Sequence, residues 1–114
     1  MSTNYKSTWT LEDARSLCIA IEAICPKYGC HVALTGGTLY KDGERKDCDI
    51  LFYRIRQVEQ IDVDGLLRAL DSMGICVLAE HGWMRKALYR GMGIDIFFPE
   101  HDDKGGDYKR EEAP

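Results

Sequence analysis

Five short apolar segments, each bounded by glycine, proline or charged residues, constrain the fold of this 114-residue chain most. They are Cys30–Thr35, Asp47–Arg56, Ile75–Ala79, Trp83–Tyr89 and Gly93–Phe98. Their short length and their β-branched and aromatic residues favour strands over helices. Turn-forming residues separate several of them, as at Asp42-Gly43 and Gly82. The sequence therefore predicts a sheet of short strands.

Two other segments carry apolar residues three and four positions apart, the spacing of a helix with one buried face. The first begins at the N-cap residue Thr10 and ends before Pro26. The second begins at Asp62 or Asp64 and runs to about Met73. Helices and strands in this order predict an α+β fold with a mixed sheet.

The composition, 45% hydrophobic and 30% charged, is typical of one globular domain. We expect an N-terminal extension over residues 1–9, the domain over residues 10–99 and a flexible charged tail over residues 100–114. A net charge of −4 argues against broad, sequence-independent binding of nucleic acid. The five cysteines lack zinc-knuckle spacing and are expected to be free thiols. The absence of a signal segment or a spanning apolar run predicts a cytoplasmic protein without membrane contact.

Three aspartates carry the chemistry that the sequence predicts. Asp47 and Asp49 are two positions apart, so both project from the same face of their strand. Asp95 lies between two isoleucines in an otherwise apolar strand, where an unpaired acid is costly. If the two strands are neighbours, the three acids converge. They would then bind Mg²⁺ (or Mn²⁺), which prefers oxygen ligands and supports in-line phosphoryl chemistry.

A glycine pair precedes the acids and predicts a phosphate site. Gly36 and Gly37 directly follow an apolar strand, where glycine lets backbone N–H groups approach a phosphate closely. Thr38 adds a hydroxyl donor, and a short helix beginning at Leu39 would favour an anion. Lys46 would contribute to a basic rim for a triphosphate or an RNA end, although such charges also fit ordinary solvated surface. That rim would also include Lys41, Arg45, Arg85, Lys86 and Arg90.

Each motif also has a plainer interpretation. Asp47 and Asp49 fit a solvated strand entry, and Asp95 alone fits an inward charge that blocks edge-to-edge pairing. Gly36-Gly37 alone fits an ordinary turn. The occurrence of all three motifs in this order favours the functional interpretation.

The same motifs resemble the polymerase-beta-type nucleotidyltransferase superfamily. The shared pattern is an apolar strand, Gly36-Gly37, an Asp-x-Asp pair on the next strand and a lone Asp on a later strand. The Gly-Gly-Thr-Leu version, with a basic stretch before the acids, is most similar to the abortive-infection toxin branch. The resemblance covers residues 10–98. It implies a nucleotidyltransferase-like mixed β-sheet of about five strands, with two main helices packed on one face.

The resemblance also implies an activity and a role for each residue. Residues 36–38 would hold the β- and γ-phosphates of a nucleoside triphosphate. Asp47 and Asp49 would bind both metal ions, and Asp95 would help to activate an attacking hydroxyl. The acceptor would be a nucleic acid, a protein or a small molecule.

Two other functions remain open from the sequence. Members of the superfamily usually carry a helical domain after the core, whereas a charged tail follows Pro99 here. The second expectation is therefore a binding module without turnover, which recognises a nucleotide or a partner protein. For either function, a protein partner or a homodimer stays open. The third expectation is a phosphoesterase or nuclease that uses the same acids.

Overall fold

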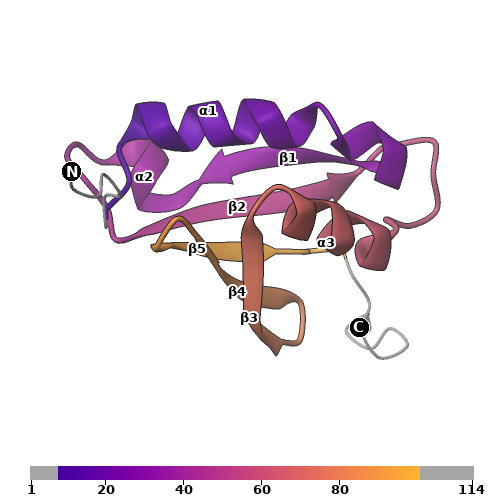
Figure 1. Cartoon of the computed structure of the whole chain (residues 1–114). Helices are drawn as coiled ribbons and strands as arrows, with labels where there is room; N and C mark the ends of the chain where they lie inside the picture. Colours follow the sequence, from indigo (N-terminus) through magenta and orange to yellow (C-terminus); the bar gives the residue numbers. More distant parts are fainter. Residues whose placement is uncertain (1–7, 101–114) are drawn as a thin grey trace, which may run out of the picture.

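The computed structural model describes residues 8–100, so residues 1–7 of the expected extension and 101–114 of the expected tail lie outside it. The elements are α1 (Leu11–Glu22), the 3₁₀ helix η1 (Cys25–Tyr28), β1 (Cys30–Thr35), α2 (Gly36–Tyr40), β2 (Asp47–Arg54), α3 (Val63–Ser72), β3 (Ile75–His81), β4 (Met84–Tyr89) and β5 (Met92–Phe97). The strands form one sheet in the order β1-β2-β5-β4-β3 (Figure 1). Strands β2 and β5 are parallel and the other neighbours are antiparallel, so the predicted mixed sheet is confirmed.

The two main helices begin at the predicted N-caps. The Thr10 side chain accepts a hydrogen bond from the backbone of Asp13 at 3.1 Å, which satisfies a free N–H at the start of α1. Asp62, one of two candidates, caps α3 by accepting from Gly65 N at 3.0 Å. Helix α1 ends at Glu22, earlier than predicted, because Pro26 lies in a separate 3₁₀ turn.

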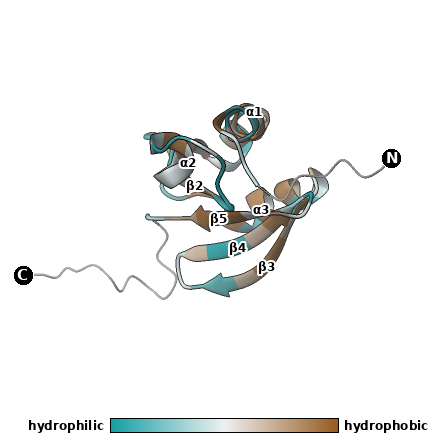
Figure 2. Cartoon of the chain, turned by 90° about the vertical axis from the view of Figure 1, so that its left-hand side faces the viewer, coloured by the Kyte–Doolittle hydropathy of each residue, from teal (hydrophilic) through white to brown (hydrophobic). Residues whose placement is uncertain are grey.

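One face of the sheet, the covered face, holds the core. Helices α1 and α3 both contribute buried side chains to it, and α1 runs along β1 and β2 in Figure 1. Strand β5, near the middle of the sheet, is among the most hydrophobic segments in Figure 2. The buried residues include Ala14, Leu17, Ile21, Cys48, Ile50, Phe52, Leu66, Leu70, Ile94 and Ile96. Both main helices therefore pack on one face, as expected.

The opposite face, the open face, carries the alternate residues of the same strands. Burial alternates along β2 and β5, since Cys48 and Ile94 are buried whereas Asp49 and Asp95 are partly exposed. Tyr53 is 41% exposed on this face. Alternation along the strands therefore separates apolar residues from the acids.

A tight turn joins β4 to β5. Strand β5 begins at Met92, one residue before the predicted segment Gly93–Phe98. Tyr89 pairs with Met92, which leaves the two-residue loop Arg90-Gly91. Both loop residues have positive φ, 54° and 81°, as the tight turns that match strand twist require. This turn places Gly93 opposite Asp47.

Trp9 belongs to the domain, although the sequence interpretation left it in the extension. Its backbone pairs with Arg45, and its side chain is 1% exposed. The indole N–H donates to Gly93 O at 2.7 Å, and the ring stacks on Tyr89. Trp9 therefore anchors the beginning of β5.

Among residues 8–100, no helix has the length and apolar character needed to cross a membrane.

Candidate active site

Two of the predicted acids lie side by side on the open face. Strands β2 and β5 are parallel neighbours, and Asp49 is the register partner of Asp95. The same register pairs Asp47 with Gly93. All three acids therefore emerge from one face of two adjacent strands, which is the arrangement required for them to act on one ligand.

The environment of Asp49 raises the pKa of its carboxyl group. Burial is the largest cause, followed by the negative charges of Asp95 and Asp47 and by a hydrogen bond with Asp95. The positive charge of Lys86 acts in the opposite direction. Two carboxyl groups side by side on adjacent strands favour a shared proton or a bound cation.

Two glycines make room for the acids. A β-carbon on Gly36 would overlap the carboxylate of Asp49, and the φ of Gly36 is +73°. A β-carbon on Gly93 would likewise overlap the carboxylate of Asp47. Glycine is therefore needed at position 36 for the acid as well as for the bend, a role that the sequence interpretation did not include.

The Gly-Gly-Thr segment, residues 36–38, already belongs to the short helix α2. The sequence had predicted a loop there, followed by a short helix that begins at Leu39. Thr38 is 3% exposed, and its hydroxyl donates to Asp47 O at 3.0 Å. This bond ties α2 to the first residue of β2, so the hydroxyl hydrogen already has an internal acceptor. Lys46 is exposed immediately before β2.

Arg45 lies beside the same helix and was predicted only as part of the basic rim. Its backbone exchanges two hydrogen bonds with Trp9: Trp9 N donates to Arg45 O at 2.6 Å, and Arg45 N donates to Trp9 O at 2.9 Å. A β-carbon on Gly37 would lie 3.5 Å from Arg45 Cδ and Nε, so the side chain packs over that glycine. Arg45 Nε is buried and has no hydrogen-bond partner among residues 8–100. A buried, unpaired guanidinium N–H next to Gly37 suits an anionic ligand.

Lys86 contacts one of the acids, Asp95, directly. It is the register partner of Asp95 on β4, and its ammonium donates to Asp95 Oδ1 at 2.8 Å. The sequence interpretation placed Lys86 in the basic rim without this partner. Only the sheet order, with β5 between β2 and β4, reveals the contact.

The carboxylate oxygens of the three acids suit a hard divalent cation, although the three side chains do not form a complete metal-binding site. Within residues 8–100, no three His, Cys, Asp or Glu side chains are gathered into a metal-binding group. Asp49 and Asp95 are in contact, while the carboxylate of Asp47 lies against Gly93. Carboxylate oxygens are the ligands that Mg²⁺ and Mn²⁺ prefer. The Asp47 side chain would have to turn toward the other two to complete the site.

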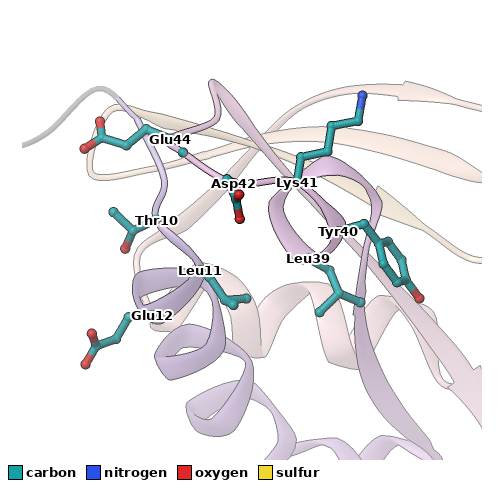
Figure 3. A pocket seen from close by; sticks show the side chains of 9 residues that line it. Thr10, Leu11, Glu12, Leu39, Tyr40, Lys41, Asp42 and Glu44 are labelled. Carbon is teal, nitrogen blue, oxygen red and sulfur yellow. The ribbon is translucent and has the colours of Figure 1, made fainter.

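A separate cavity of about 430 Å³ lies between the start of α1 and the connection from α2 to β2 (Figure 3). Its lining includes Leu11, Leu39 and Tyr40, together with charged residues of the connection. None of the three acids lines it. The cavity is therefore distinct from the acid cluster, which we define as Asp47, Asp49 and Asp95.

Solved structures share this fold. Cid1 in complex with the UTP analogue UMPNPP aligns with a TM-score of 0.61 and 10% identity over 79% of this chain and 28% of that one. The chain has the fold of a nucleotidyltransferase domain. A cytoplasmic RNA terminal U-transferase aligns with a TM-score of 0.61 and 11% identity. Cid1 in complex with its short product ApU aligns with a TM-score of 0.58 and 10% identity. Both alignments also cover 79% of this chain and 28% of the other.

These similarities confirm the predicted α+β nucleotidyltransferase-like fold and, at such low identity, establish the fold alone. The chain spans less than a third of the length of these neighbours, 28% in each case. No family model matches the sequence, and no curated protein matches it.

Proposed function

We propose that this chain is a metal-dependent nucleotidyltransferase domain that moves a nucleotide from a nucleoside triphosphate to a hydroxyl acceptor. The observation that carries the proposal is the placement of Asp49 beside Asp95, with Asp47 on the same face and Gly36 against Asp49. Support comes from the fold shared with a protein bound to a UTP analogue and with an RNA terminal U-transferase.

The acid cluster would hold Mg²⁺ or Mn²⁺. Such an ion supplies neutralisation of the phosphate charge and alignment of the reacting oxygens. Asp49 and Asp95 fix the position of the site because the two strands hold them in register. Asp95 would accept the proton of the attacking hydroxyl, and pyrophosphate would be the leaving group.

The phosphates would lie against the beginning of α2. Backbone N–H groups of Gly36 and Gly37 would donate to them, with Lys46 at the rim. The Thr38 hydroxyl, also predicted as a phosphate donor, would have to exchange its bond to Asp47 O for one to phosphate. Arg45 joins this set, because its Nε is buried and unpaired beside Gly37.

The narrower assignments belong to the same proposal. The Gly-Gly-Thr-Leu segment and the basic residues before the acids support the abortive-infection branch. The acceptor would be a nucleic acid, a protein or a small molecule, and a protein partner or a second copy of the chain would supply contacts that this small domain lacks.

One observation favours a second candidate, a nucleotide- or protein-binding module without turnover. Lys86 already neutralises Asp95 in the structure, at 2.8 Å, so the acids are compatible with a resting, metal-free protein. Such a module would bind a nucleotide without forming product.

The test is to incubate the protein with each labelled nucleoside triphosphate, Mg²⁺ or Mn²⁺, and single-stranded RNA, protein or small-molecule acceptors. Transfer with release of pyrophosphate is expected, and Asp49→Asn and Asp95→Asn should abolish it. Asp64→Asn is the matched control, since Asp64 is an exposed acid on α3. Nucleotide binding by calorimetry without product, unchanged by Asp95→Ala, would favour the binding module, and hydrolysis products alone would indicate a phosphoesterase.

A further inference from the structure

Lys86 completes a row of charged side chains across three adjacent strands. Asp49 on β2 pairs with Asp95 on β5, and Asp95 pairs with Lys86 on β4. The ammonium nitrogen lies 2.8 Å from Asp95 Oδ1. The charges of Asp47 and Asp49 also attract it. Lys86 is therefore the counterion of the whole acid cluster.

The two ends of this ion pair differ in their freedom to move. The Lys86 side chain is 46% exposed and that of Asp95 is 18% exposed. A lysine ammonium sits on a flexible four-carbon chain, whereas a short Asp side chain follows its strand. When a cation enters, Lys86 is the group that can leave.

A divalent cation and Lys86 need the same carboxylate. A bare cation must displace the ammonium and leave it without a partner. A cation already bound to a triphosphate brings negative phosphate oxygens, which give the displaced ammonium a new partner. The exchange is then close to neutral in charge.

We propose that Lys86 is a built-in counterion that disfavours loading of the acid cluster by bare metal and favours entry of the metal as its complex with a nucleoside triphosphate. This inference rests on the proposed function, because it assumes that the acid cluster binds metal. It assigns to Lys86 a positioning role, in which it holds Asp95 until the phosphates arrive.

The experiment measures binding of Mn²⁺ alone, by the loss of the free-ion electron paramagnetic resonance signal, at neutral pH and low salt. Lys86→Gln should bind Mn²⁺ about 5-fold more tightly than the wild type, a change of the size expected for a partly exposed ion pair. Because a triphosphate itself binds Mn²⁺, binding of the Mn²⁺ complex of a non-hydrolysable triphosphate is measured by equilibrium dialysis against a protein-free blank, and there this advantage should disappear or reverse. The nucleotide-dependent gain in Mn²⁺ affinity should therefore fall at least about 5-fold in the variant.

Two variants control for charge. Lys86→Arg keeps the positive charge and should retain the wild-type preference for metal–triphosphate. Lys27→Gln removes an exposed lysine from η1, at the far end of β1 from the acids, and should leave Mn²⁺ binding unchanged. Circular dichroism establishes that each variant is folded.

The outcomes separate the two proposals. If Lys86→Gln binds Mn²⁺ with wild-type affinity in both conditions, while Asp49→Asn and Asp95→Asn weaken binding, the role of Lys86 is overturned and the metal site stands. If the acid variants and the wild type all fail to bind Mn²⁺ with or without triphosphate, the metal site is overturned and the inference falls with it.

Discussion

The two faces of strand β2 differ although their residues alternate along one chain. Cys48, Ile50 and Phe52 are fully buried on the covered face. Asp49 and Tyr53, on the open face, are partly exposed. The covered face stabilises the fold through apolar burial, while the open face keeps acids close together at the expense of stability. Substitutions one residue apart should therefore affect different properties.

The largest effect on stability is expected from Phe52→Ala. Phe52 is fully buried and stacks on Phe98, so truncation should lower the free energy of unfolding by about 3–5 kcal/mol. Tyr53→Ala, on the open face, should lower it by less than about 1 kcal/mol. Urea denaturation of both variants measures the difference. Equal losses in the two variants would show that side chains on the covered face do not contribute more to stability than those on the open face.

The largest effect on activity is expected from Asp49→Asn. The proposed reaction should slow by at least about 100-fold, because the metal loses a charged ligand and transition-state charge is less well neutralised. The variant should not lose stability, in contrast to Phe52→Ala. Steady-state kinetics of transfer, with circular dichroism of the same sample, measures both properties.

Gly36→Ala tests the contact between the glycine bend and the acids. The positive φ of Gly36 and the overlap of a new β-carbon with Asp49 should lower the free energy of unfolding by about 1–3 kcal/mol. Because the carboxylate must move, metal affinity should fall as well. Gly43→Ala is the matched control: its φ is +90°, but no atom of the described residues, 8–100, lies within 4 Å of the new β-carbon. If both variants weaken metal binding equally, the overlap with Asp49 is not the cause.

Thr38→Val tests whether the Thr38 hydroxyl has a structural role. The change removes the donor to Asp47 O and leaves a carbonyl without that partner, which should lower the free energy of unfolding by about 1 kcal/mol. Chemical denaturation measures it. An unchanged stability with weakened triphosphate binding would instead assign the hydroxyl to the phosphates.

Side-chain alternation and motif order were sufficient to predict much of the fold and the acid cluster. Asp47 and Asp49 had to share a face, and the apolar surroundings of Asp95 marked it as unusual. The partners of the cluster were missed because they depend on which strands become neighbours. Lys86 reaches Asp95 only because β5 lies between β2 and β4.

The residues that support the site gave weaker signals. Trp9 lies in a polar segment without periodicity, and its burial depends on a bridge to Arg45 that is distant in sequence. The burial of Arg45 Nε beside Gly37 likewise depends on residues that are distant from it in the sheet order or the chain. Local patterns therefore indicated the chemistry, whereas long-range pairing determined its surroundings.

The smallest expected effect is a gain in stability, and it tests whether the open face opposes folding. Burial and the neighbouring acids raise the pKa of Asp49 above its value in the unfolded chain. The stabilisation from its protonated form is fully present below the unfolded pKa and is lost as the pH rises through the folded pKa. At neutral pH the ionised group therefore opposes folding. Asp49→Asn should raise the free energy of unfolding there by about 0.5 kcal/mol or less, since solvent screens this partly exposed group.

Urea denaturation of the wild type and Asp49→Asn in metal-free buffer, at pH 7 and at about pH 3, measures the contrast. The gain should be present at pH 7 and absent at low pH, where Asp49 is protonated in both the folded and the unfolded chain. Asp64→Asn, an exposed acid on α3, should show no such pH-dependent gain. A loss of stability in Asp49→Asn at pH 7 would mean that the attraction to Lys86 outweighs the repulsion among the acids. In that case, the open face would stabilise the fold even without a bound ion.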